Sequence, residues 1–137
     1  MMQPSKQKHR KQFRGKRGGV ATANNEVTLG AFGLKTVECG WLNAREIEAA
    51  RRAITASIKR KGRVWIKIFP DKPYTQKANN SKMLGGKGDV EGYVAVVKPG
   101  TMLFEMAGVS AVAAQEAMRL GGNKLSLKTK FVVKKEL

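Results

Sequence analysis

The residue types that usually carry out catalysis or bind metals are few in this chain, and their spacing suits neither task. His9 is the sole histidine and Cys39 the sole cysteine, which excludes an internal disulfide and a thiolate metal cluster. Glu46 and Glu48 are two residues apart on a predicted helix and point in different directions, so they do not form a carboxylate pair for acid–base catalysis. We therefore expect no catalytic residue, no metal site and no cofactor, and we predict that the protein is not an enzyme.

The two single residues have simple interpretations. His9 falls in a flexible basic arm, where it is expected to be an arm residue and not a general base. Cys39 borders a predicted strand, where cysteine most often packs as a small buried apolar residue. A lone cysteine also fits a reducing interior compartment.

The segment GGKGD at residues 85–89 is partly similar to a nucleotide-binding phosphate loop. That motif requires Gly, four residues, and then Gly-Lys-Ser/Thr. Counting back from Gly86 and Lys87 places Ser81 where the first glycine belongs, and Gly88 stands where a hydroxyl should hold magnesium. The match fails at both ends, so we interpret the segment as a cationic turn that can approach phosphates closely without catalysis.

The overall charge predicts a polyanionic partner. The 137 residues include 27 Lys and Arg against 10 Asp and Glu, a formal net charge of +17, while 42% of the residues are hydrophobic. The apolar fraction indicates a folded domain, and so large a charge opposes compaction unless nucleic acid or an anionic membrane offsets it. Binding to nucleic acid would then weaken strongly with salt.

A membrane or a secretory route is not expected. No apolar run approaches the roughly 18 residues that a membrane span requires, and residues 1–19 lack the apolar segment of a secretory signal. We expect a cytoplasmic protein with no membrane partner and no small-molecule substrate.

The cations are predicted to lie on three elements. Residues 1–25 form a basic arm without an acidic residue before Glu26, interpreted as an arm that becomes ordered on RNA or, alternatively, as a solubilising tail. A helix at 43–62 carries a row of cations, which is either a solvated face paired with Glu48 through Arg45 and Arg52 or an RNA-facing surface. The row consists of Arg45, Arg52 and Lys59, with Arg51 and Arg60 beside them. An extended loop at 70–90 is the third, because connections beyond about 12 to 15 residues are usually functional or disordered.

The remaining pattern predicts one α+β domain at 26–137 with a mixed, mostly antiparallel sheet and two helices packed on it. The first helix is capped by Asn43 with Glu46 in a capping box, ends at Gly62 and buries Ile47, Ala50, Ile54 and Ile58. The second spans 110–122, with Ser110 as cap and Gly121 and Gly122 at its end. Strands are expected at 27–39, at 63–69 as a central strand with Trp65 and Phe69 in the core, in a hairpin at 93–108 that turns at Pro99 and Gly100, and at 125–137.

Aromatic residues make up 7% of the chain and do not form the paired stacking strips of sheets that read single strands. We therefore favour recognition by shape and phosphate over base-by-base readout.

Several long segments closely resemble the bacterial and organellar large-subunit ribosomal protein sixteen family, nearly over the whole chain and in the same order. They are MMQPSKQKHRKQFRGKRGG, GLKTVECGWLNAREIEAARRAITASIKRKGRVWIKIFPDKP, GKG with VAVVKPGTMLFEM, and KTKFVV. IEAARRA and KGRVWIKIFPDKP are the most specific of these.

The resemblance implies a structural ribosomal protein that binds large-subunit ribosomal RNA, lies among neighbouring ribosomal proteins and contacts acceptor-site tRNA, with peptidyl-site tRNA as a further candidate. An organellar ribosome is the alternative location. The site residues are carried over from the family or taken from the cation pattern. For rRNA they are Lys6, Lys8, Arg10, Lys11, Arg14, Lys16, Arg17, Arg51, Arg52, Lys59 and Arg60, and for the tRNA loop Lys77, Lys82, Met83 and Lys87.

The chain departs from the family pattern within that loop. The family usually has Arg-Met-Gly where this chain has Lys82, Met83 and Leu84. Lysine keeps the charge but loses the planar fork that grips a phosphate through two bonds. Leu84 replaces a glycine that permits close backbone approach.

A free RNA-binding module, such as a translational regulator or an RNA chaperone, is the alternative function. It would share the charge but would not require the family segments. An enzyme acting on RNA ranks third because the chain lacks a catalytic set.

Overall fold

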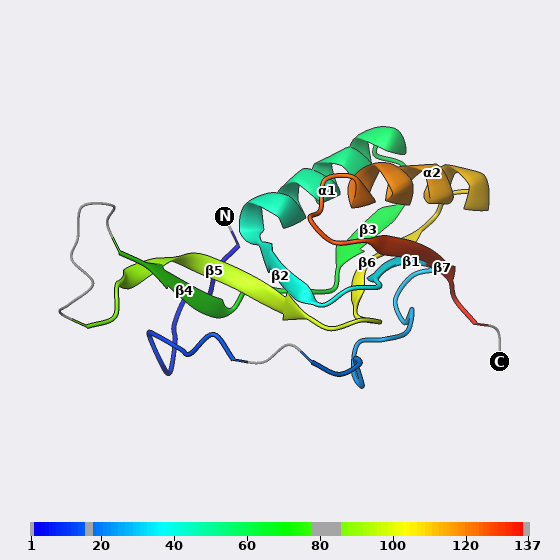
Figure 1. Ribbon diagram of the computed structural model, residues 1–137. Helices are drawn as coiled ribbons and strands as arrows, with labels where there is room; N and C mark the ends of the chain where they lie inside the picture. The colour runs from blue at the N-terminus through cyan, green and yellow to red at the C-terminus, as the bar shows by residue number, and fades with distance from the viewer. Residues whose placement is uncertain (1, 16–17, 78–85, 136–137) are drawn as a thin grey trace.

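The computed structural model describes residues 2–15, 18–77 and 86–135 of the chain. Two helices lie over one sheet, and a second sheet extends away from them (Figure 1). In chain order the elements are β1 (Phe32–Thr36), β2 (Gly40–Asn43), α1 (Ala44–Ser57), β3 (Arg63–Ile66), β4 (Lys72–Gln76), β5 (Asp89–Val97), β6 (Met102–Ala107), α2 (Ala111–Gly122) and β7 (Thr129–Val133).

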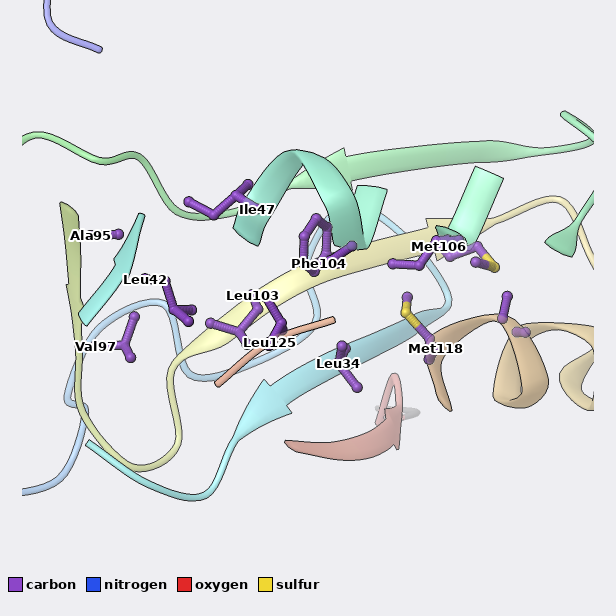
Figure 2. Packing of buried hydrophobic residues seen from close by; sticks show 14 of the residues in the cluster. Leu34, Leu42, Ile47, Ala95, Val97, Leu103, Phe104, Met106, Met118 and Leu125 are labelled. Atoms are coloured by element: carbon purple, nitrogen blue, oxygen red, sulfur yellow. The ribbon is translucent and has the colours of Figure 1, made fainter. Parts of the chain in front are cut away.

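The four-stranded sheet has the order β3-β6-β1-β7, with every neighbouring pair antiparallel. The helices pack against each other, and α2 also contacts β1 and β7 while α1 contacts β3. Between helices and sheet lies the main apolar cluster, in which Leu103, Phe104 and Met106 of β6 are fully buried (Figure 2). The α+β class with two helices is therefore confirmed.

The three-stranded sheet has the order β2-β5-β4 and is also antiparallel. Its strand β4 lies within the predicted loop at 70–90, so that expectation is corrected for Lys72–Gln76. Pro73 is tolerated within β4 because β4 is an edge strand, where a missing N–H does not interrupt the ladder. The strands thus form two antiparallel sheets where the sequence predicted one.

The predicted hairpin at 93–108 is wrong in its pairing. Its turn is present, because Thr101 N–H donates to the Lys98 carbonyl at 3.0 Å and Gly100 has a φ of 96°, as a type II turn requires after Pro99. The two flanking strands nevertheless belong to different sheets, since β5 pairs with β2 and β4 whereas β6 pairs with β1 and β3. The turn is the corner where the chain passes from one sheet to the other.

The start of α1 follows the sequence only in part. Asn43 Oδ1 accepts from the Glu46 N–H at 2.9 Å, which confirms the cap. The Glu46 carboxylate does not complete a capping box, because it accepts instead from the N–H and hydroxyl of Ser126, at 3.1 and 2.8 Å. The predicted core face is confirmed, with Ile47 and Ile54 among its fully buried members.

The bounds of α2 are as predicted. Ser110 caps the helix by accepting from the Ala113 N–H at 3.2 Å, and Gly121 and Gly122 are its last two residues. A Cβ on Gly121 would lie 2.6 Å from Ile54 Cγ1, closer than real contacts allow. The glycine therefore permits the close approach of α1 and α2.

Three single residues lie differently from their predictions. β3 is an edge strand and not a central one, and it ends at Ile66 where the prediction continued to residue 69. Trp65 is half-buried, and Phe69, which lies beyond the strand, is exposed by 47%. Cys39 is exposed and not buried. The apolar pattern of residues 63–69 predicted a longer and more central strand than the one that forms, and it therefore overestimated the burial of Trp65 and Phe69.

A buried carboxylate anchors the segment before β1. Glu105 of β6 is fully buried, and its Oε1 accepts from the backbone N–H groups of Thr28, Leu29 and Gly30 at 2.8, 2.7 and 3.0 Å. Lys67 Nζ lies 3.2 Å from Oε2. Burial alone would raise the pKa of Glu105, but these hydrogen bonds outweigh it and lower the pKa below its usual value.

Candidate nucleic-acid interface

Residues 7–14 of the N-terminal arm lie against the three-stranded sheet, held by side chains of that sheet and its loop. Lys87 Nζ donates to the Gln12 carbonyl, and Lys72 Nζ donates to the Arg14 carbonyl. In return, Lys11 Nζ donates to the Lys87 carbonyl at 3.3 Å. In two of the three contacts a lysine of the β4–β5 region donates to an arm carbonyl, so Lys11 is the one arm cation that these contacts use.

Further contacts place the arm along the same sheet. Gln7 Nε2 donates to the Asp71 carbonyl at 3.3 Å and Gln7 Oε1 accepts from the Tyr93 hydroxyl at 3.3 Å. Lys87 Nζ also lies 5.3 Å from the centre of the Phe13 ring, within cation–π range. Figure 1 shows the blue arm passing beside the β4–β5 ribbon.

The predicted arm cations are directed to solvent. Lys6, Lys8, Arg10 and Arg14 are exposed, while Lys11 is half-buried. In the β4–β5 connection, Lys87 is exposed and Lys77 half-buried. The fold therefore brings arm and loop cations to one region, which we call the arm–hairpin surface (residues 6–14, 72, 77 and 87). Lys16, Arg17, Lys82 and Met83 lie outside the described residues.

The predicted cation row on α1 is shorter than expected. Glu48 pairs with Arg52 at 3.2 Å, as predicted, but its partner three residues away is Arg51, at 2.5 Å, and not Arg45. The hydrogen bond from Arg51, followed by the charge of Arg51 and the contact from Arg52, outweighs desolvation and lowers the pKa of Glu48 to about 2. Lys59 leaves the row because α1 ends at Ser57.

One residue that the sequence reasoning missed is Lys72. It lies on β4, within hydrogen-bonding reach of the Arg14 carbonyl and 5.4 Å from the centre of the Trp41 ring. Lys72 is visible as the lysine of FPDKP, but the sequence predicted a loop there. A loop does not fix the direction of a side chain, whereas strand β4 does.

The described residues offer no metal or membrane chemistry. In those parts of the chain, no group of three or more His, Cys, Asp or Glu side chains could hold a metal ion. Neither described helix is long and apolar enough to span a bilayer.

An α+β fold with cations gathered on an arm, a hairpin and a helix defines a basic protein suited to a polyanionic partner. The model of the Ribosomal protein L16p/L10e family matches residues 4–132, and the chain belongs to this family. The resemblance found in the sequence is thereby confirmed. The protein is a structural constituent of the large ribosomal subunit and not an enzyme, and its partners are ribosomal RNA and the ribosome.

Proposed function

We propose that the protein binds large-subunit rRNA through the arm–hairpin surface and through α1, and that the connection between β4 and β5 contacts acceptor-site tRNA. The observation that carries this proposal is the docking of the arm on the hairpin through Lys72 and Lys87. It makes the arm and the base of the loop one surface instead of two independent appendages.

Electrostatics support this use of the surface. Lys6, Lys8 and Arg10 are exposed, and no described ion pair joins any of them to a carboxylate of the chain. Cations whose charge is not neutralised within the protein gain most from phosphates, because counterion release from RNA then drives binding. Arg51 and Arg52 on α1 share one carboxylate, Glu48, so net positive charge remains there too.

The organisation we propose follows from the same contacts. Residues 1–25 act as the rRNA-binding arm and residues 26–137 as the domain that carries it, in a cytoplasmic ribosome among neighbouring ribosomal proteins. The loop itself begins after β4, at Lys77, and ends before β5, at Gly88.

The tRNA contact is tested on large subunits reconstituted without the protein and then supplied with variants. Lys82→Ala with Lys87→Ala should leave the fold intact and weaken tRNA occupancy of the acceptor site, measured for each subunit that has incorporated the protein. Two exposed charge contacts of about 0.2 to 1 kcal/mol each correspond to a loss of roughly two- to thirtyfold. Unchanged tRNA affinity at full incorporation would contradict the tRNA contact.

Two further variants separate the possible causes. Lys72→Ala loosens the arm at Arg14 but leaves the loop cations in place, so tRNA occupancy should be retained. Lys8→Ala with Arg10→Ala removes arm charge and should instead reduce incorporation into the subunit. Normal incorporation of that arm variant at moderate and at high salt would contradict rRNA binding by the arm.

A further inference from the structure

The turn that follows α1 has two residues with positive φ angles, which usually favour glycine, and both residues are cations. The Lys59 N–H donates to the Ala56 carbonyl at 3.2 Å and the Arg60 N–H to the Thr55 carbonyl at 3.1 Å, the pattern of a Schellman motif. Lys59 and Arg60 have φ angles of 53° and 61°. In this left-handed region a Cβ meets the backbone, and residues held there mark functional sites more often than chance.

The turn places cations around a shallow pocket of about 330 Å³ between α1 and β3. Arg51, Arg60, Lys61 and Arg63 line it, together with Thr55, and none of its lining residues is acidic. We call these residues the α1–β3 pocket. Lys61 and Arg63 were not among the site residues predicted from the sequence, although both lie in the run KRKGR.

The two flanking arginines are oriented by their neighbours. Glu48 accepts from Arg51 Nε at 2.9 Å and from Nη2 at 2.5 Å, which fixes the plane of that guanidinium. The Arg63 guanidinium lies over the Trp65 ring, 5.2 Å from its centre. A guanidinium held in this way loses little further freedom when it binds, because its planar fork is already positioned.

The turn itself is pressed against the end of β6. Gly62 has a φ of 72°, and a Cβ there would lie 2.4 Å from the Ala107 carbonyl oxygen. The backbone of residues 59–63 is therefore constrained on its inner side, while Arg60 and Lys61 remain exposed. Arg51 is paired with Glu48, so Arg60, Lys61 and Arg63 are the like charges that repel each other around the hollow, and an anion seated in it would relieve that repulsion.

We propose that the α1–β3 pocket is a built site for a single backbone phosphate of RNA. This inference rests on the proposed rRNA binding and makes it more specific. Several cations bind the same phosphate, whereas independent side chains would each bind a different one. In Figure 1 the C-terminal end of α1 lies well away from the ends of β4 and β5 that flank their connection. The pocket is therefore a second anchoring point, separate from the arm–hairpin surface.

The proposal is tested with the full chain and deproteinised large-subunit rRNA, measuring affinity by filter binding over a series of KCl concentrations. Each neutralised phosphate contributes about 0.7 to 0.9 to the slope of log K against log salt. Arg60→Ala with Lys61→Ala and Arg63→Ala, which removes the three cations of the pocket that are not paired with Glu48, should lower the slope by about one such step and weaken binding about fivefold or more at moderate salt. Arg63→Lys, which keeps the charge, should keep the slope and lose affinity.

The outcomes distinguish the pocket from independent contacts. A slope reduced by about two or three steps means that the three cations meet separate phosphates, and an unchanged slope means that they meet none. Either result overturns the pocket. Urea midpoints equal to wild type show that the variants are folded. Failure of the wild-type chain to bind this rRNA would refute the proposed function instead, so the two ideas fail by different results.

Discussion

Replacing the buried Glu105 with glutamine should destabilise the protein and remove part of its pH dependence. Glutamine has the same shape, so its oxygen can still accept from the N–H groups of Thr28, Leu29 and Gly30, which now donate to Glu105 Oε1. Those bonds lose their charge assistance, and the amide group replaces the oxygen that lies 3.2 Å from Lys67 Nζ. Two donors then face each other in a site where the carboxylate is fully buried.

The expected loss follows from these contacts. Breaking a buried ion pair from one side costs about 3 to 5 kcal/mol, and glutamine retains neutral hydrogen bonds, so we expect a free energy of unfolding lower by about 2 to 4 kcal/mol at pH 7. For a domain of this size that corresponds to a melting temperature lower by roughly 6 to 15 °C. Urea unfolding followed by tryptophan fluorescence measures it.

The pH dependence provides the stricter test. The pKa of Glu105 is lowered in the folded protein, so its stabilising contribution is complete above the unfolded pKa of about 4.3 and is lost as pH falls through the folded pKa. Protonated glutamate resembles glutamine, so the difference in free energy of unfolding between wild type and Glu105→Gln should become smaller below pH 4. If this difference is absent at pH 7, or if it stays constant down to acid pH, ionised Glu105 does not stabilise the folded protein as described. Glu116→Gln, which removes an exposed carboxylate that pairs with Arg119 on the surface of α2, is the control and should change the free energy of unfolding at pH 7 by less than about 1 kcal/mol.

The remaining predictions concern two positions where glycine and a side chain are exchanged. Lys59→Gly should raise the free energy of unfolding by about 0.5 to 1 kcal/mol, because relief of left-handed strain exceeds the added entropy of the unfolded chain. Its rRNA affinity in filter binding should fall, since a cation is lost. A variant less stable than wild type would show that the Lys59 backbone is not strained. Gly121→Ala should lower stability by about 1 to 3 kcal/mol in urea unfolding, because its Cβ would meet Ile54 Cγ1 at 2.6 Å. Gly18→Ala, whose Cβ would meet no atom within 4 Å, should be neutral.

The local features of the helices were predictable from neighbouring residues. Asn43 and Ser110 cap their helices as expected, because a cap depends on a side chain and an N–H only three residues away. The buried face with Ile47 and Ile54 follows from a spacing of three and four, which a helix converts into one side. These features depend on residues three or four positions apart, so they form whatever the arrangement of the rest of the chain.

The candidate site was predictable in composition but not in arrangement. The arm cations and Lys87 were identified from charge and from the family resemblance, yet their association depends on Lys87 donating to Gln12 across 75 residues of chain. Lys61 and Arg63 stood in an evident basic run, but only the Schellman turn after α1 assembles them around a pocket with Arg51.

The sequence by itself determined the α+β class, the helix starts, the turn at Pro99 and Gly100, the basic character and the family, because each depends on composition, local spacing or a long matched segment. Only the tertiary structure decided that β5 and β6 enter different sheets, that β4 forms within the expected loop and that Glu105 is a buried anchor. The physical reason is that strand pairing and burial are set by contacts between distant residues. A turn in the sequence indicates where the chain changes direction. Which strands then pair is decided by the free energy of packing the sheets, to which residues far apart in the sequence contribute.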